Sequence, residues 1–293
     1  MIESEIPTDL LPTPEEVEFY KEHGYYASKK IFSDEQLDQV VEATERFYAG
    51  EVEPCGVEPI DRFIQKYGPP SVDDWGNQLR KNDYASFACP ALGELVRSPV
   101  VGAIAARLSG SPEIRLWHDQ LLFKPPQNPG VPSNVGWHAD LRYWMLCTSK
   151  NMLTAWIPFH DVDEEIGSIT MIDGSHKWNI NFYDLDFFDS NLDALEDKLG
   201  AEVTEVRRVP MELKKGQVSF HHCLTLHGSG PNHTDKPRRS VAVHLQDATN
   251  DYREHVEPDG NICWHYNVEI GQRKGTEKPD FKDPEGFPVL YKE

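Results

Sequence analysis

A series of short β-prone runs beyond residue 113 constrains the fold more than any other feature of the chain. The runs are separated by clusters of glycine, proline, asparagine and aspartate, which favour turns. They cover residues 114–124, 153–160, 168–172, 203–213, 217–221 and 240–246. Short strands at such intervals are typical of antiparallel barrels and jelly rolls, the architecture that includes the cupins. We therefore expect a mainly β fold with flanking helices, built on a double-stranded β-helix (jelly-roll, cupin-like) core.

The first 110 residues have helical patterns instead. Thr13 and Ser33 each begin a capping box, because a glutamate or glutamine follows the hydroxyl residue three positions later. We expect helices after both residues, the second ending near Gly50, and a short strand at 26–32 between them. A serine followed by a proline predicts the start of a further helix over 98–108.

We predict a single domain over residues 1–293, with a helical part at about 12–110, the jelly-roll core at about 113–247 and an irregular C-terminal tail. The 22 prolines and 20 glycines are spread along the chain and are not gathered in one linker. The acidic, aromatic segment 179–200 interrupts the strands. It is either a lid over the mouth of the barrel or a helical insertion.

The charge balance bears on the partners of the chain. With 29 basic and 49 acidic side chains, the formal net charge is -20. So acidic a chain would repel a phosphate backbone or an anionic membrane surface, and we expect no nucleic acid and no membrane as a partner. The longest nearly apolar stretch, 99–108, is about half a membrane span. Because the five cysteines are an odd number without CxxC spacing, we expect a cytoplasmic protein. The sequence does not distinguish a monomer from a homodimer.

His138 and Asp140 in the sequence GWHAD are the sharpest chemical signal. On an extended strand, residues two apart project from the same face, so this pair could present an imidazole and a carboxylate to one metal ion. His227 lies 89 residues later and begins the turn-rich sequence HGSGPN, so a returning strand could bring it to the same ion. Two histidines and one carboxylate that leave open positions are the ligand set of non-haem Fe(II) oxygenases.

Arg238 follows His227 by eleven residues and begins a β-prone run. Its guanidinium fork could hold one carboxylate of a dicarboxylic cosubstrate, whereas the alternative is a surface arginine beside Asp235. Ser229 could add a hydroxyl hydrogen bond to the same carboxylate, or could serve only the turn.

Together these segments resemble the phytanoyl-CoA dioxygenase (PhyH-like) family of Fe(II)/2-oxoglutarate-dependent oxygenases. The resemblance spans roughly residues 14–246 and rests on EEVEFYKEHGYY, LLFKPP, WHAD, LTAWIPFHDVDEEIGSITMIDGSH and HGSGPNHTDKPRR. One departure is Asp173 in DGSH, where the family usually has proline. The resemblance implies a dioxygenase that uses Fe(II), 2-oxoglutarate and dioxygen to hydroxylate or otherwise oxidise its substrate, with release of succinate and CO2.

The resemblance also implies roles for individual residues. His138, Asp140 and His227 correspond to the iron ligands, and Arg238 to the residue that binds the distal carboxylate of 2-oxoglutarate, with Arg239 as its alternative. The resemblance assigns Ser229 and Thr154 to assisting the cosubstrate. Because halogenating relatives have glycine or alanine at the carboxylate position, the presence of Asp140 favours hydroxylation over halogenation.

The substrate is expected to be a small organic molecule, since the acidic net charge makes a polyanionic CoA ester less attractive. His118, Gln120 and Leu122 share one strand face, and with the aromatic residues near the metal segments they are candidate pocket residues, although each aromatic could instead be core. The substrate-binding candidates are His118, Gln120, Trp144, Trp156 and His222.

Two other functions use the same residues. A zinc-dependent hydrolase or isomerase could use His138, Asp140 and His227, because these ligands do not select the metal by themselves. A catalytically silent barrel could bind a metal or a small ligand without oxidising anything. Dependence on 2-oxoglutarate distinguishes both from the oxygenase.

Overall fold

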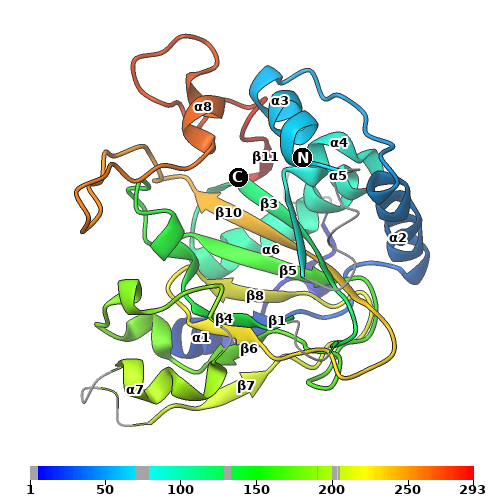
Figure 1. Ribbon diagram of the computed structural model, residues 1–293, viewed down its shortest axis with the longest axis vertical. Helices are drawn as coiled ribbons and strands as arrows, with labels where there is room; N and C mark the ends of the chain where they lie inside the picture. The colour runs from blue at the N-terminus through cyan, green and yellow to red at the C-terminus, as the bar shows by residue number, and fades with distance from the viewer. Residues whose placement is uncertain (1–5, 70–78, 129–132, 190, 200–202, 204) are drawn as a thin grey trace.

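A computed structural model describes residues 6–69, 79–128, 133–189, 191–199, 203 and 205–293. The chain forms two antiparallel sheets with helices around them (Figure 1). The prediction of antiparallel strands with flanking helices is therefore confirmed. Within these ranges, no helix combines the length and the apolar character needed to cross a bilayer.

The larger sheet has the order β1-β8-β5-β10-β3-β11, and β2 pairs with β3 beside this path. Its strands are β1 (Tyr25–Ala27), β2 (Arg80–Asp83), β3 (Glu113–Lys124), β5 (Leu153–Pro158), β8 (Ser219–His222), β10 (Arg238–Asp247) and β11 (Val289–Lys292). The long central strands correspond to the β-prone runs of the sequence. The expected strand at 26–32 is shorter than predicted.

The smaller sheet has the order β4-β9-β6-β7. Its strands are β4 (Val135–His138), β9 (His227–Ser229), β6 (Thr170–Ile172) and β7 (Arg208–Pro210). The run 203–213 is thus a strand over only three residues, and residue 204 lies outside the described part. β4 was not among the β-prone runs, because four residues are too few for an alternating pattern to be recognised, but the extended strand expected at His138 is present.

Helices lie against both sheets, because the short helix at Leu195–Leu199 packs with Trp137 and Ile172 of the smaller sheet and the others lie around the larger sheet (Figure 1). They are α1 (Pro14–His23), α2 (Asp34–Tyr48), α3 (Glu58–Tyr67), α4 (Ala85–Ala88), α5 (Pro90–Val96), α6 (Pro99–Ser109), α7 (Leu195–Leu199) and α8 (Asn267–Gln272). Both predicted capping boxes are present, at Thr13 and Ser33. The C-terminal tail is more regular than predicted, because it contains α8 and supplies β11, which pairs with β3.

The strand β5 shows how the core is divided. Leu153, Ala155 and Ile157 face the helices and belong to the main hydrophobic core, which includes α6. Trp156 points the other way and packs with Met171 of the smaller sheet. All six residues of β5 are buried, because both faces of the strand are covered. The face between the two sheets is where the candidate site lies.

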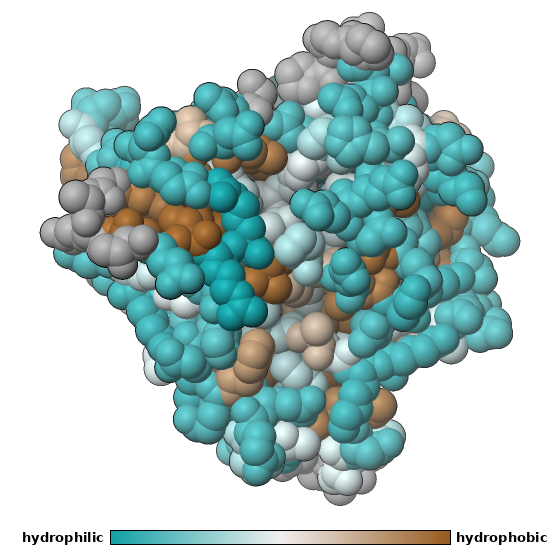
Figure 2. Space-filling view, turned by 90° about the horizontal axis from the view of Figure 1, so that it is seen from below, coloured by the Kyte–Doolittle hydropathy of each residue, from teal (hydrophilic) through white to brown (hydrophobic). Residues whose placement is uncertain are grey.

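Figure 2 shows one face of the molecule, on which hydrophilic residues predominate and apolar residues form small separate patches. Such a distribution agrees with the acidic composition of the chain. Among the described residues, no large continuous apolar patch is visible on this face.

Candidate active site

The structure brings the three predicted metal ligands together. His138 ends β4 and pairs in register with His227, the first residue of β9. Asp140 does not continue the strand but begins the 3-10 helix η3 (Asp140–Tyr143). Ala139 between them is extended, so His138 and Asp140 still face the same side. One possible ligand atom from each of the three residues lies within 4.8 Å of the other two.

Backbone carbonyls orient both imidazole rings. Nδ1 of His138 lies 2.8 Å from the carbonyl oxygen of Gly136, and Nδ1 of His227 lies 2.9 Å from that of Thr225. A proton on Nδ1 satisfies each contact and leaves Nε2 as an acceptor. The two Nε2 atoms lie 3.9 Å and 3.7 Å from Oδ1 of Asp140. Three electron-pair donors thus converge on one point.

The other carboxylate oxygen of Asp140 is fixed by the larger sheet. Thr154 donates its hydroxyl hydrogen to Oδ2 over 2.6 Å, and Nε2 of His221 lies 3.3 Å from the same atom. Nδ1 of His244 lies 2.8 Å from the Thr154 hydroxyl. Thr154, expected to assist a cosubstrate, therefore positions the carboxylate, although it also lines the cavity beside it. The role of His244 was missed, since no local sequence pattern places it at this site.

Electrostatics favour the protonation states that a metal requires. Burial lowers the pKa of His138 and lowers that of His227 well below its ordinary value, so both rings are neutral near pH 7. Burial opposes ionisation of Asp140, but the surrounding histidines and the hydrogen bond from His221 lower its pKa well below the usual range. Neutral imidazoles and an ionised carboxylate are the forms that bind divalent metals.

A cavity behind these ligands, here called the inner cavity, lies between the two sheets. The residues with predicted roles that line it are Gln120, Leu122, Thr154, Trp156, Ser229 and Arg238. Arg238 is buried and donates a hydrogen bond to the carbonyl oxygen of Gly167 over 2.7 Å. Its Nε has no hydrogen-bond partner, and its guanidinium lies 5.4 Å from the centre of the Trp156 ring. Burial lowers the pKa of Arg238 to about 9.

Lys124 is a second buried cation, directly opposite Arg238 in the pairing of β3 with β10. Its ammonium donates to the Ser229 hydroxyl over 2.6 Å and to the carbonyl oxygen of Gly230. Burial, and then the charge of Arg238, lowers the pKa of Lys124 well below its ordinary value. Neither cation forms an ion pair with a described residue. Two adjacent buried cations without an anionic partner are costly, and a bound carboxylate would compensate them.

The alternation of side chains along β10 decides between the two neighbouring arginines. Arg238 faces the inner cavity, whereas Arg239 faces outward and forms an ion pair with Glu45 over 2.8 Å. Lys124 was missed as a site residue, although it lies in the LLFKPP motif, because the sequence alone does not show that its side chain turns inward.

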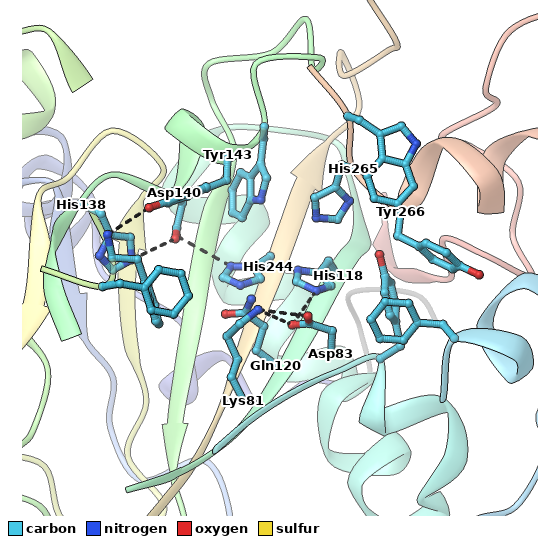
Figure 3. A pocket seen from close by; sticks show the side chains of 16 residues that line it. Lys81, Asp83, His118, Gln120, His138, Asp140, Tyr143, His244, His265 and Tyr266 are labelled. Atoms are coloured by element: carbon cyan, nitrogen blue, oxygen red, sulfur yellow. Dashed lines mark hydrogen bonds and ion pairs between the residues drawn. The ribbon is translucent and has the colours of Figure 1, made fainter. Parts of the chain in front are cut away.

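A larger cavity of about 300 Å³, here called the outer cavity, opens on the other side of His138 and Asp140 (Figure 3). His118, Gln120 and Trp144 line it, as their positions in the sequence suggested. His222 was predicted to contact substrate but lines neither cavity. It faces the opposite side of β8 from His221 and lies beside Tyr20 and His176. The period of two along a strand explains this error.

Two segments far apart in the sequence complete the outer cavity. The C-terminal tail contributes Trp264, His265 and Tyr266, and the segment 179–200 contributes Phe187 and Phe188. The second segment lies against β4, because the amide of Gly136 donates to the carbonyl oxygen of Phe187 over 2.8 Å. The described part of this segment therefore covers the site. Its closure as a lid stays a prediction.

Comparisons with known sequences identify related proteins. The sequence model of the family described as Phytanoyl-CoA dioxygenase (PhyH) matches residues 20–240. Phytanoyl-CoA dioxygenase, peroxisomal, of Bos taurus is 26% identical over 241 residues, which are 81% of this chain and 69% of that protein. The probable alpha-ketoglutarate-dependent hypophosphite dioxygenase of Stutzerimonas stutzeri is 28% identical over 232 residues, with 76% and 75% covered.

Solved structures share the fold. The non-haem alpha-ketoglutarate-dependent carbocyclase SnoK from nogalamycin biosynthesis superimposes with a TM-score of 0.67 at 24% identity, covering 95% of this chain and 96% of that one. EctD from S. alaskensis, solved with 2-oxoglutarate and 5-hydroxyectoine, has a TM-score of 0.62 at 17% identity, covering 86% and 82%.

Proposed function

The chain belongs to the phytanoyl-CoA dioxygenase family, and we propose that it oxidises a small organic metabolite at the site formed by His138, Asp140 and His227. The protein is an Fe(II)/2-oxoglutarate-dependent dioxygenase, the enzyme class of its relatives. Hydroxylation is the proposed outcome, since the carboxylate of Asp140 occupies the position that halogenating enzymes leave free. The two antiparallel sheets are proposed to form the double-stranded β-helix of such enzymes.

The residues present fit both cofactors. Two neutral imidazoles and one carboxylate would hold the iron and leave coordination positions open. Arg238 would hold one carboxylate of 2-oxoglutarate, and Lys124, which donates to the Ser229 hydroxyl in the cavity wall, would add its positive charge nearby. When bound, Fe(II) and 2-oxoglutarate supply, together with dioxygen, the oxidising power for hydroxylation, with succinate and CO2 as products.

The protein's own contribution is positioning. The hydrogen bond from Thr154 holds Oδ2 of Asp140, so that Oδ1 stays directed at the histidine rings. The carbonyl oxygens of Gly136 and Thr225 hold His138 and His227 in the tautomer that presents Nε2. Phe187 and Phe188, together with Trp264 of the C-terminal tail, line the outer cavity, where the substrate would bind next to the metal.

The observation that carries this proposal is the pair of buried cations beside the ligand set. A zinc hydrolase would use the same three ligands but would need no buried cations beside them. A silent barrel would not need to retain two adjacent positive charges that destabilise the fold when unpaired.

The direct test is anaerobic addition of 2-oxoglutarate to the Fe(II)-loaded protein. We expect the weak visible charge-transfer band of a keto acid bound to ferrous iron. The band should be lost in His138→Ala and retained in His233→Ala, a histidine exposed on the surface. Absence of the band in folded, iron-loaded wild-type protein would favour the zinc enzyme or the silent barrel.

Asp140→Ala tests the ligand assignment. Removing the carboxylate should lower the rate of 2-oxoglutarate turnover at least about 100-fold. Loss of a residue that only supports a metal ligand already lowers metal affinity or activity by about 10- to 100-fold, and this change removes a ligand itself. Consumption of 2-oxoglutarate at the wild-type rate would contradict the assignment. The exposed Asp193, altered to alanine, serves as the matched control.

A further inference from the structure

The two cavities differ in their charge. The cation Arg238 lines the inner cavity, and a second cation, Lys124, lies behind its wall and donates to Ser229; neither has an anionic partner among the described residues. In the lining of the outer cavity, the charges of Lys81 and Asp83 compensate each other. The ammonium of Lys81 lies 3.0 Å from both carboxylate oxygens of Asp83, and Nε2 of His118 lies 3.2 Å from one of them (Figure 3). A charged ligand would have to compete with these contacts. The outer cavity therefore suits an uncharged molecule.

Tyr84 and Tyr266 present rings and not free hydroxyl groups to the outer cavity, whereas the hydroxyl of Tyr143 keeps a hydrogen that a ligand could accept. Tyr84 donates its hydroxyl hydrogen to Oδ1 of Asn267 over 2.7 Å, and Tyr266 donates to the carbonyl oxygen of Pro59 over 2.7 Å. The hydroxyl oxygen of Tyr143 accepts from a backbone amide over 3.1 Å. With their hydroxyl hydrogens engaged, Tyr84 and Tyr266 offer apolar π surface to a ligand.

Two aromatic side chains at the rim of the outer cavity are largely exposed to solvent. Phe188 is 79% exposed and Trp264 is 60% exposed, although both line the cavity. Phe188 lies on the side of the metal ligands, because it packs against Phe187, whose ring centre is 5.0 Å from that of His138. Trp264 lies on the opposite side with Tyr266, at 5.9 Å between ring centres. Figure 3 shows His138 and Tyr266 across the cavity from each other.

Nδ1 of His118 has no hydrogen-bond partner among the described residues, and the side chain of Gln120 is a second free polar group of the outer cavity. It lines both cavities, and its amide has no hydrogen-bond partner within the described part of the chain. Its position on β3, between the two cavities, places a donor and an acceptor next to the metal ligands. A ligand with a carbonyl or hydroxyl group at its inner end would satisfy it.

From these features we infer that the outer cavity binds an uncharged, flat ring system, held between Phe188 and Trp264, with a carbonyl or hydroxyl group directed at Gln120. This inference rests on the proposed function, since it names the class of substrate presented to the iron. A cavity of about 300 Å³ lies at the small end of ligand pockets, which agrees with a bicyclic or tricyclic compound.

The test is calorimetric titration of the protein, anaerobically loaded with Fe(II) and 2-oxoglutarate, with the flat bicyclic lactam carbostyril. The comparison compounds are its saturated, puckered analogue, a quinoline carboxylate and decanoyl-CoA. We expect carbostyril to bind at least about tenfold more tightly than each of the others. Tighter binding of the carboxylate or the CoA ester, equal binding of the saturated lactam, or no binding of carbostyril would overturn the inference.

Variants locate the bound probe. Phe188→Ala and Trp264→Ala should each weaken carbostyril binding about fivefold, and Gln120→Leu should weaken it similarly. Phe19→Ala should leave it unchanged, because Phe19 is also exposed, at 41%, but does not line the cavity. Equal effects of all four variants would contradict the proposed binding mode.

Repeating the titration on metal-free protein separates this inference from the proposed function. Carbostyril binding that depends on Phe188 and Trp264 would support the ring-binding cavity even if 2-oxoglutarate gave no visible band with iron. A band without selective carbostyril binding would support the oxygenase and refute only the substrate class.

Discussion

Lys124 and Arg238 are the two buried cations proposed to attract the cosubstrate. Each side chain is buried, and the two lie directly opposite on neighbouring strands. Burial, and then the positive charge of Arg238, lowers the pKa of Lys124. Without an anion nearby, the two charges repel each other. A dicarboxylate converts this unfavourable pair into a binding site.

At the residue scale, Arg238→Gln and Lys124→Met should each raise the 2-oxoglutarate concentration needed for half-maximal turnover by at least about tenfold, since a charge-assisted hydrogen bond contributes about 1.5–3 kcal/mol. Iron binding, measured by direct titration, should change little. Arg239→Gln is the control, because that side chain pairs with Glu45 at the surface. An unchanged requirement in Arg238→Gln would remove this residue from the cosubstrate site.

At the element scale, β4 depends on a glycine at its centre. A Cβ added to Gly136 would lie 2.1 Å from the carbonyl oxygen of Asp186 and 2.8 Å from that of Asp189. The backbone of the segment 179–200 can therefore approach β4 only because position 136 has no side chain.

Gly136→Ala should lower the free energy of unfolding by about 1–3 kcal/mol and expose the segment 179–200 to proteolysis. Urea unfolding and limited proteolysis measure the two effects. Gly230→Ala is the matched control, since an added Cβ there meets no atom within 4 Å. Wild-type stability and protease resistance in Gly136→Ala would show that the segment does not depend on this close approach.

The strand β8 places adjacent histidines in different environments. His221 contacts Asp140, whereas His222 is directed away from the site, and burial lowers the pKa of His222 to about 4. Because this value lies below that of an unfolded histidine, about 6.5, the stability contributed by neutral His222 is present above pH 6.5 and is lost as the pH falls toward 4.

His222→Asn should therefore reduce the acid sensitivity of folding. Between pH 7 and pH 4.5 the wild type should lose about 2 kcal/mol more unfolding free energy than the variant, as measured by urea titration at both pH values. Asparagine retains an acceptor for the amide of Leu224, which now donates to Nδ1 of His222. Parallel pH profiles would show that protonation of His222 does not oppose folding.

At the scale of the whole molecule, net charge and site charge have opposite signs. The chain carries a formal charge of -20, yet a cation, Arg238, lines the inner cavity and a second one, Lys124, lies opposite it on the neighbouring strand. Net charge governs long-range attraction and solubility, whereas a buried site depends on the few groups that line it. The two sheets meet at this site, so ligands bound there should stabilise the entire fold.

Fe(II) and 2-oxoglutarate together, each at about 100 times its dissociation constant, should raise the Tm by at least about 4 °C under anaerobic conditions. Differential scanning calorimetry measures the shift. In Arg238→Gln, 2-oxoglutarate at the same concentration should raise the Tm of the iron-loaded protein much less than it does in the wild type. A Tm that does not respond to iron or to 2-oxoglutarate would contradict binding at the junction of the sheets.

Local sequence patterns determined much of the architecture. The capping boxes at Thr13 and Ser33 and the β-prone runs depend on interactions between near neighbours, so they could be recognised without a structure. The candidate ligands His138, Asp140 and His227 were identified by their residue types, their spacing and the resemblance of the surrounding segments.

Only the tertiary structure decided which groups surround those ligands. Strand pairing placed Lys124 opposite Arg238, and packing placed the hydroxyl of Thr154 on Asp140. The C-terminal tail, which has no readable pattern, supplies Trp264 to the outer cavity. Each of these contacts joins residues far apart in the sequence. They form only when the two sheets and the tail pack together in the folded protein, so no local sequence pattern could predict them.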